Sequence, residues 1–219
     1  MHMGKNKDVR ESVEHELDFD PLVDASDITV KNLNGQVALS GTVPSYPQYV
    51  EAAAAARRVA DVKNVHNHLE VALPPGDYRD DPTLTTIANN ALALNITVPA
   101  GIEATARNGN VTLTGTVRYG TERAAAERAI AGLTGVRNIR NEIEIRHDAE
   151  RLDVTLNVQD ALNRHALVPA DSDVTVETSG NTVTLSGHVQ TWAERDAAVD
   201  AAWMTLGVYD VRDELFVIG

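Results

Sequence analysis

Apolar residues along this chain switch between helical spacing and strand alternation. The clearest example lies in the middle of the sequence, where a helix is predicted from residues three or four positions apart. These residues are Leu84, Ile87, Ala91 and Leu94. Every second residue is then apolar over residues 102–106 and 111–117, which predicts two strands. A second helical stretch and a last alternating strand follow, so the predicted order is α-β-β-α-β.

The same order is predicted on either side of this segment. First helices are indicated by apolar residues at helical spacing: Val9, Val13 and Leu17 near the start, and Val154, Val158 and Leu162 in the last third. The second helices share a face of small or apolar residues. On that face lie Ala52, Ala55, Ala56 and Val59, then Ala126, Ala129, Ile130 and Leu133, then Ala198, Ala201, Ala202 and Thr205. Small residues would let each helix lie close to a sheet.

A repeated motif sets the register of these three segments. Leu-x-Gly-x-Val recurs around Gly41, Gly115 and Gly187, which are 74 and 72 residues apart. The last strand of each segment follows at a constant offset, because its first valine lies 21 residues after the glycine in all three. A fixed offset held three times indicates one module written three times.

Glycine also marks the predicted hairpin turns. Asn34-Gly35 and Asn108-Gly109 stand between alternating segments, and such pairs favour two-residue turns in which both residues have positive φ. Ser179-Gly180 is the corresponding pair in the third copy. One extra residue separates Gly180 from Gly187, which predicts a bulge or a longer turn.

The fold class predicted from these patterns is α+β. We expect three tandem α-β-β-α-β domains, each a three-stranded sheet with two helices on one face. The predicted domains span residues 1–73, 83–146 and 152–219. Residues 74–82 form a linker that three prolines should keep stiff and extended, and residues 147–151 form a shorter linker.

Charge restricts the classes of partner. The chain has 19 basic and 32 acidic residues, a formal net charge of −13. An acidic surface repels phosphate backbones, so nucleic acid is not an expected partner. Anionic membranes are disfavoured as well, unless a local basic patch overrides the net charge. The third copy is the most acidic, with 11 acidic and 4 basic residues over 151–219.

Other features of the composition concern the compartment. The chain has no cysteine, which excludes disulfides and thiolate chemistry but fits either a reducing or an oxidising compartment. Residues 1–20 are polar and contain no apolar core of a signal peptide, and there is no transmembrane run of 18 apolar residues. As the sequence stands, we expect a soluble cytoplasmic protein. A periplasmic location is the alternative if a signal segment has been removed.

The repeated residues resemble the BON domain, a module named for bacterial osmotically induced and nodulation proteins. The resemblance rests on Leu-x-Gly-x-Val, on the Glu-Arg pairs at 122–123 and 194–195, on Gly-Val at 135–136 and 207–208, and on the Val-x-Asn-x-Leu/Ile-x-Val strand. The first copy departs from it with Gln48-Tyr49 and Asp61-Val62. All three copies carry the pattern, so the resemblance covers nearly the whole chain.

The resemblance implies a function that the motifs themselves do not encode. BON domains are regarded as non-enzymatic modules proposed to bind phospholipids or envelope partners, often in stress proteins. The hypothesis is therefore a binding or scaffolding protein of bacterial envelope or osmotic stress physiology, without catalytic residues or cofactors. The alternative is a purely protein–protein module in which three copies provide avidity. The sequence does not indicate an oligomeric state.

Metal binding has one weak pair of candidates. His66 and His68 lie two residues apart in a predicted strand and point the same way, with Glu70 next on that face. Two imidazoles and a carboxylate are common zinc ligands. The opposing interpretation is a solvated sheet face, because the second copy has Arg140, Glu142 and Glu144 at these positions.

The third copy offers the best candidates for an interaction surface. Trp192, Val199 and Trp203 fall together on a helical wheel, away from the small-residue face. This second apolar stripe contains both tryptophans of the chain, and the other copies lack it. The stripe packs against a neighbouring copy or serves an external protein, dimer or membrane contact. Phe216, where the other copies have Glu70 and Glu144, gains weight only if it joins this surface.

Overall fold

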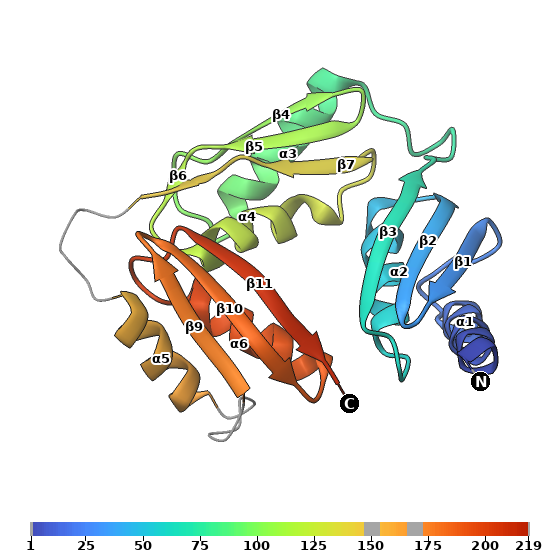
Figure 1. Ribbon diagram of the computed structural model, residues 1–219. Helices are drawn as coiled ribbons and strands as arrows, with labels where there is room; N and C mark the ends of the chain where they lie inside the picture. Colours follow the sequence, from blue (N-terminus) through green and yellow to red (C-terminus); the bar gives the residue numbers. More distant parts are fainter. Residues whose placement is uncertain (1, 147–153, 166–172, 219) are drawn as a thin grey trace. The chain divides into compact units, whose positions relative to one another are not determined.

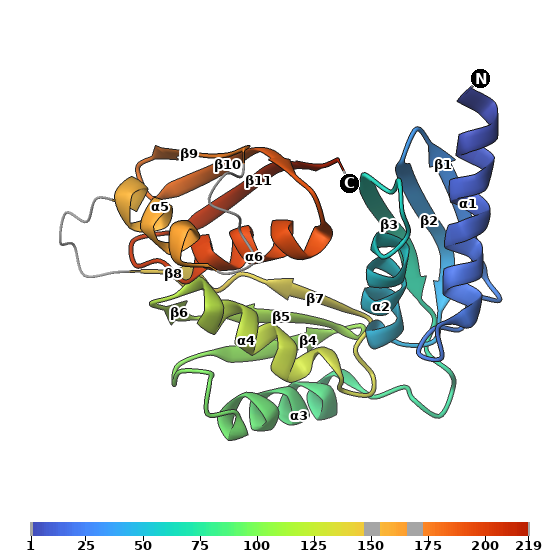
Figure 2. The ribbon, with the colours of Figure 1, turned by 90° about the horizontal axis from the view of Figure 1, so that it is seen from below.

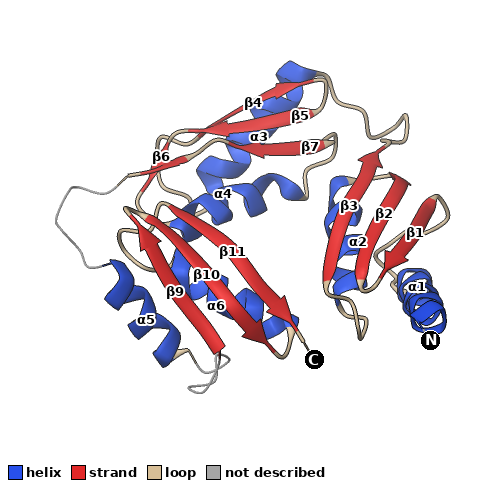
Figure 3. Cartoon of the chain, in the orientation of Figure 1, coloured by secondary structure: helices blue, strands red, loops and turns tan. Residues whose placement is uncertain are grey.

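The computed structural model describes residues 2–146, 154–165 and 173–218 (Figure 1). These residues form six helices and eleven strands. They follow the order α-β-β-α-β three times, with two strands of the second repeat each divided into two (Figure 3). The predicted α+β class and its threefold repetition are confirmed. The predicted linker at residues 147–151 lies outside the described residues.

The first repeat contains a three-stranded sheet with β2 at its centre. Its elements are α1 (His2–Phe19), β1 (Ile28–Leu33), β2 (Gln36–Val43), α2 (Tyr46–Arg57) and β3 (Asn64–Val71). β1 pairs antiparallel with β2 through the hairpin, and β3 pairs parallel with β2. The parallel pairing requires a crossover, which α2 supplies. β3 is consequently an outer strand of this sheet.

The third repeat has the same arrangement. Its elements are α5 (Val154–Arg164), β9 (Asp173–Ser179), β10 (Thr182–Val189), α6 (Trp192–Trp203) and β11 (Asp210–Val217). β10 is central, antiparallel to β9 and parallel to β11. Both helices lie on one face of the sheet (Figure 2). Buried apolar residues from both helices and all three strands form one core between the layers, including Val158, Leu185, Ala198, Ala202 and Leu215.

In the second repeat the strands are interrupted. Its elements are α3 (Asp81–Leu94), β4 (Glu103–Arg107), β5 (Asn110–Thr114), β6 (Thr116–Val117), α4 (Gly120–Ala131), β7 (Asn138–Asn141) and β8 (Glu144–Ile145). Backbone pairing nevertheless continues across the break. The N–H of Glu142 donates to the carbonyl of Leu113 at 2.9 Å, and the N–H of Glu144 donates to that of Gly115 at 3.0 Å. The interruption is therefore local.

The first helices bury equivalent stripes. Val9, Val13 and Leu17 of α1 are buried, as are Val154, Val158 and Leu162 of α5, as predicted. The stripe predicted for α3 was wrong in phase. Its buried residues are Leu84, Ala88 and Leu92, whereas Leu94 is 84% exposed. α3 is apolar on more than one side, so a stripe at i, i+3 and i+7 fitted its sequence as well as the true i, i+4 and i+8 stripe.

α3 begins inside the segment predicted as the first linker. Pro82 occupies the first turn, where its missing N–H is not needed. Asp80 caps the helix by accepting from the N–H of Thr83 at 2.9 Å. Hydrogen bonds from this N–H and from the Thr83 hydroxyl lower the pKa of Asp80. The chain therefore returns to regular structure at Asp81.

The hairpin turns explain the extra residue of the third repeat. Asn34 and Gly35 both have positive φ, as predicted for a two-residue turn. In the third repeat Ser179 pairs with Thr182, so the turn residues are Gly180 and Asn181. Only Gly180 has positive φ there, which fits a turn with glycine first. The predicted bulge or longer turn was wrong, because the third hairpin also has a two-residue turn, one position later than Ser179-Gly180.

The repeated glycine lies where the backbone leaves no room for a side chain. A Cβ on Gly41 would stand 1.9 Å from the carbonyl oxygen of Asp27, and one on Gly187 would stand 1.7 Å from that of Asp173. Gly115 would meet the carbonyl oxygen of Gly101 at 2.6 Å. All three glycines have φ between 114° and 131°, which side chains rarely allow. Glycine is therefore needed at this position, because a side chain would collide with the backbone at the start of the first strand of the repeat.

Candidate functional site

A hydrogen bond between the second helix and the last strand recurs in the first two repeats. Asn67 donates from Nδ2 to the carbonyl of Tyr49 at 2.7 Å, and its Oδ1 accepts from the N–H of Leu69 at 3.2 Å. Asn141 makes the same two contacts with Arg123 and Ile143. The asparagine of the repeated strand motif thus fixes the helix to the sheet.

The third repeat replaces this contact with an ion pair. Asp213 occupies the asparagine position, and its Oδ2 accepts from Nε of Arg195 at 2.8 Å. The Arg195 guanidinium lies 4.9 Å from the centre of the Trp192 ring, a favourable cation–π distance. One face of Trp192 is therefore covered by a side chain of its own helix. The tryptophan presents less apolar surface than the sequence predicts.

Trp203 and Val199 occupy similar positions at the side of α6. Both are half-buried, and together with Trp192 they pack against the buried core of the third repeat. The buried face of α6 itself consists of alanines, namely Ala197, Ala198, Ala201 and Ala202. The three predicted interaction residues thus border the core. The Trp203 ring also lies against Gly120 of α4 in the second repeat, with the Arg123 guanidinium 6.0 Å from its centre.

Phe216 lies on the opposite face of the sheet. Its neighbours Leu215 and Val217 are buried against the helices, so Phe216 points to the open face, where 63% of it is exposed. The ring of His188 lies 6.2 Å away, and Nδ1 of His188 is 2.9 Å from Oδ2 of Asp173. Ile218, 56% exposed, follows on the same side. The structure does not bring Phe216 together with the tryptophans.

The two histidines proposed as weak metal candidates stack on the open face of the first repeat. The rings of His66 and His68 are 6.4 Å apart and nearly parallel, and Nε2 of His66 is 3.2 Å from Oε1 of Gln36. Both side chains are exposed. Among the described residues no group of three or more His, Cys, Asp or Glu could hold a metal ion.

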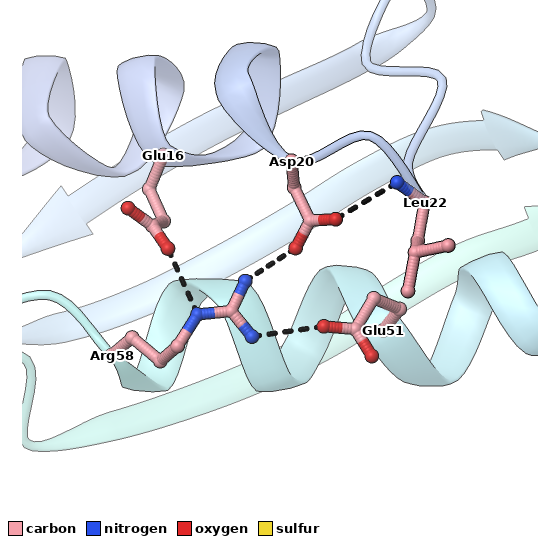
Figure 4. A network of polar contacts seen from close by, with 5 residues as sticks. All are labelled: Glu16, Asp20, Leu22, Glu51 and Arg58. Atoms are coloured by element: carbon pink, nitrogen blue, oxygen red, sulfur yellow. Dashed lines mark hydrogen bonds and ion pairs between the residues drawn. The ribbon is translucent and has the colours of Figure 1, made fainter.

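An arginine joins the two helices of the first repeat (Figure 4). Nε of Arg58 donates to Glu16 at 2.8 Å, and Nη1 donates to Glu51 at 2.8 Å. Nη2 donates to Asp20, whose side chain is only 6% exposed. One guanidinium at the C-terminal end of α2 therefore links Glu16 and Asp20, at the end of α1, to Glu51 in the middle of α2.

The environment of Asp20 favours its charged form. The N–H of Leu22 donates to Oδ1 of Asp20 at 2.9 Å, and this bond contributes most to lowering the pKa of Asp20. Burial acts in the opposite direction, and the Arg58 guanidinium then lowers the pKa further. The pKa of Arg58 is raised in turn, mainly by its hydrogen bonds to Glu51 and then to Glu16.

Comparison with known proteins decides the family. The family model described as "BON domain" matches residues 5–72, 80–147 and 152–219. The chain belongs to the BON domain family. Each match contains a complete α-β-β-α-β repeat apart from residues at its ends. BON domains are associated with phospholipid or envelope binding, and the family is a family of binding domains.

Other comparisons add little. Among curated proteins no match was found. A solved structure of the C-terminal domain of CdsD, a structural protein of the type III secretion system of Chlamydia trachomatis, aligns at 18% identity over 97% of this chain and 98% of that one, with a TM-score of 0.26. A second CdsD structure aligns at 19% identity over 96% and 92%, with a TM-score of 0.27.

Sequence reasoning missed the Arg58 network and its replacement in the third BON domain. Equivalent positions follow from the buried helix residues and from the repeat glycines. Glu16, Asp20, Glu51 and Arg58 correspond to Ala161, His165, Ala197 and Met204. A comparison of the copies at these helix positions would have revealed the difference. At the position of Arg58 the third domain has Met204, which cannot form these ion pairs.

No helix among the described residues of the BON domains is long and apolar enough to cross a bilayer.

Proposed function

We propose that this protein is a non-enzymatic binding and scaffolding protein of bacterial envelope or osmotic stress physiology. Its BON domains bind phospholipid or envelope partners. The observation that carries the proposal is the match of three BON domains over most of the chain. The motif residues shared by the repeats have structural roles, since Gly41 admits the backbone of Asp27 and Asn67 joins a helix to a strand. Binding therefore falls to positions where the repeats differ.

The third domain is the proposed contact point. It alone combines Trp192, Val199 and Trp203 beside α6 with Phe216 on the open face. Tryptophan and phenylalanine are enriched at protein interfaces, and tryptophan also at the polar surface of bilayers. Because these residues lie on two faces of the domain, they form two separate candidate surfaces.

Co-sedimentation of the full chain with vesicles tests the lipid hypothesis. Vesicles of neutral and of anionic lipid are compared at low and at physiological salt, because screening by salt weakens charge-driven binding. Binding accompanied by a blue shift of tryptophan fluorescence supports the proposal. Failure to bind either lipid at either salt concentration removes the phospholipid part of the proposal.

A matched pair of variants locates the surface. Phe216→Glu gives the third domain the residue that its siblings carry at this position, Glu70 and Glu144. The control is Glu144→Gln, an exposed change on the corresponding strand of the second domain. If the open face of the third domain binds, the first variant weakens binding and the control does not.

Protein–protein binding is the second candidate, and the net charge favours it. A chain of net charge −13 is repelled by anionic lipid. Three domains in tandem would then raise the apparent affinity for a repeated or oligomeric partner through effective concentration. Capture of a defined partner by the full chain, lost on dividing the chain into single domains, would distinguish this function.

A further inference from the structure

The inter-helix position that is bridged in the first BON domain is open in the third. A groove of about 570 Å³ lies between α5 and the C-terminal end of α6. This volume falls within the range typical of small-molecule sites. The groove is bordered by Ala161 and Met204, which replace Glu16 and Arg58 of the first domain. Where the first domain has an ion pair between its helices, the third domain therefore has a groove.

One side of the groove is apolar. Ala201, Met204 and Leu206 line it together with Ala161 of α5. Met204 is 59% exposed and Leu206 is 38% exposed. Their exposed surface is available to an apolar chain, and methionine adapts readily to the shape of such a ligand.

Opposite charges line the helix α5 along the same groove. Asp160 and Arg164 are one helical turn apart, about 6 Å along the axis, and His165 follows at the C-terminal end. Although their spacing would permit an ion pair with each other, neither Asp160 nor Arg164 forms one with any residue of the described ranges. An anion placed at Arg164 and a cation placed at Asp160 would therefore both gain a partner.

We propose that this groove binds a single-chain amphiphile with a zwitterionic phosphate–ammonium headgroup. Arg164 and His165 bind the phosphate, Asp160 binds the ammonium, and the acyl chain lies against Met204 and Leu206. The inference deepens the proposed phospholipid-binding function and rests on it. A zwitterionic headgroup also suits the charge of the third domain, because the excess of acidic residues there disfavours a purely anionic ligand.

Calorimetry of the full chain tests the site with lysophosphatidylethanolamine below its micellar concentration. We expect binding of this probe and weaker binding of lysophosphatidylglycerol, which has no ammonium group. Glycerophosphoethanolamine, which lacks the acyl chain, should bind much more weakly still. Arg164→Gln should lower the affinity for lysophosphatidylethanolamine by about tenfold or more, the effect of losing a charged hydrogen bond. Asp160→Asn should abolish the preference over lysophosphatidylglycerol.

A graft of the first domain's ion pair closes the groove without removing core residues. Ala161→Glu with Met204→Arg reproduces the pair that Glu16 and Arg58 form at 2.8 Å, and we expect it to abolish binding. The matched control is Ala91→Glu with Gly132→Arg, the same graft in the second domain, where a Cβ on Gly132 would meet nothing within 4 Å. Tryptophan fluorescence verifies that the grafted third domain remains folded.

The outcomes separate this site from the wider function. The site is refuted if lysophosphatidylethanolamine fails to bind, or if it binds the folded third-domain graft as tightly as the parent chain. Vesicle binding that survives in either case leaves the proposed function standing. Loss of probe binding in the third-domain graft alone supports the site, whether or not intact vesicles bind.

Discussion

Asp213 accepts a hydrogen bond from Arg195 at the position where Asn67 of the first BON domain donates one to the carbonyl of Tyr49. In both domains this strand position joins the last strand to the second helix, but Asn67 donates the hydrogen bond whereas Asp213 accepts it. In both domains the Oδ1 atom still accepts from the backbone N–H two residues later. The exchange leaves the backbone unchanged but brings a cation over Trp192. The contact between the second helix and the last strand is therefore present in both domains, but in the third domain it also changes the surface around Trp192.

Removal of the asparagine contact should destabilise the first domain. Asn67→Ala loses a half-buried hydrogen bond to Tyr49 and one to Leu69. We expect a loss of about 1–2 kcal/mol in the free energy of unfolding, measured by urea denaturation. Asn90→Ala, at an exposed position of α3, is the control and should change stability by less than about 0.5 kcal/mol. Equal effects of both substitutions would contradict the structural role of Asn67.

The repeat glycine should tolerate no side chain. Gly187→Ala places a Cβ against the carbonyl of Asp173 and holds a side chain at φ 114°. The backbone strain alone costs about 1–3 kcal/mol, and the close contact adds to it. Because both tryptophans lie in the third domain, a lower denaturation midpoint by tryptophan fluorescence reports this loss directly. Gly76→Ala, where a Cβ meets nothing within 4 Å, should have little effect.

The Asp20 contacts should make stability depend on pH in the acid range. The pKa of Asp20 is lowered in the folded state, so its contribution is full above the unfolded pKa of about 4 and is lost as pH falls through the folded value. Asp20→Asn should therefore destabilise the protein at neutral pH and much less near about pH 3. Urea denaturation of both proteins at both pH values measures this difference. A pH-independent difference would contradict the electrostatic origin.

The guanidinium above Trp192 should have a spectroscopic signature. Arg195→Gln removes the cation from the ring and weakens the contact with Asp213. We expect altered tryptophan emission and a loss of stability of about 1 kcal/mol. Arg212→Gln, an exposed change on β11, is the control. Unchanged emission in Arg195→Gln would mean that the cation does not influence the ring in solution.

The fold could be predicted because each repeat encodes it locally and the copies confirm one another. The helices, hairpins and last strands follow from spacing, and Gly41 and its two equivalents fix the register. Errors arose where a local pattern had two solutions. α3 is apolar on several sides, so Leu94 was placed with the buried stripe. Ser179-Gly180 matched the turn pattern as well as Gly180-Asn181, which the strand pairing selects.

The contacts that distinguish the repeats could not be predicted in the same way. Arg58 reaches Glu16 and Asp20 over 42 and 38 residues of sequence, and no local spacing indicates that these residues meet. The cation above Trp192 depends likewise on a pairing with Asp213, 18 residues beyond Arg195. The alternation in β11 places Phe216 away from the helices. Its separation from the tryptophans becomes clear only when the sheet and α6 are seen together.

The outer position of β11 bears on how the protein behaves at high concentration. An outer strand exposes unpaired backbone groups to which a strand of another molecule could add. β11 carries Asp210, Arg212, Asp213 and Glu214 within five residues. Such a density of charge opposes the approach of an equivalent strand. The outer position of β11 leaves this edge of the sheet accessible, and its charged residues should protect the edge from fibrillar self-association.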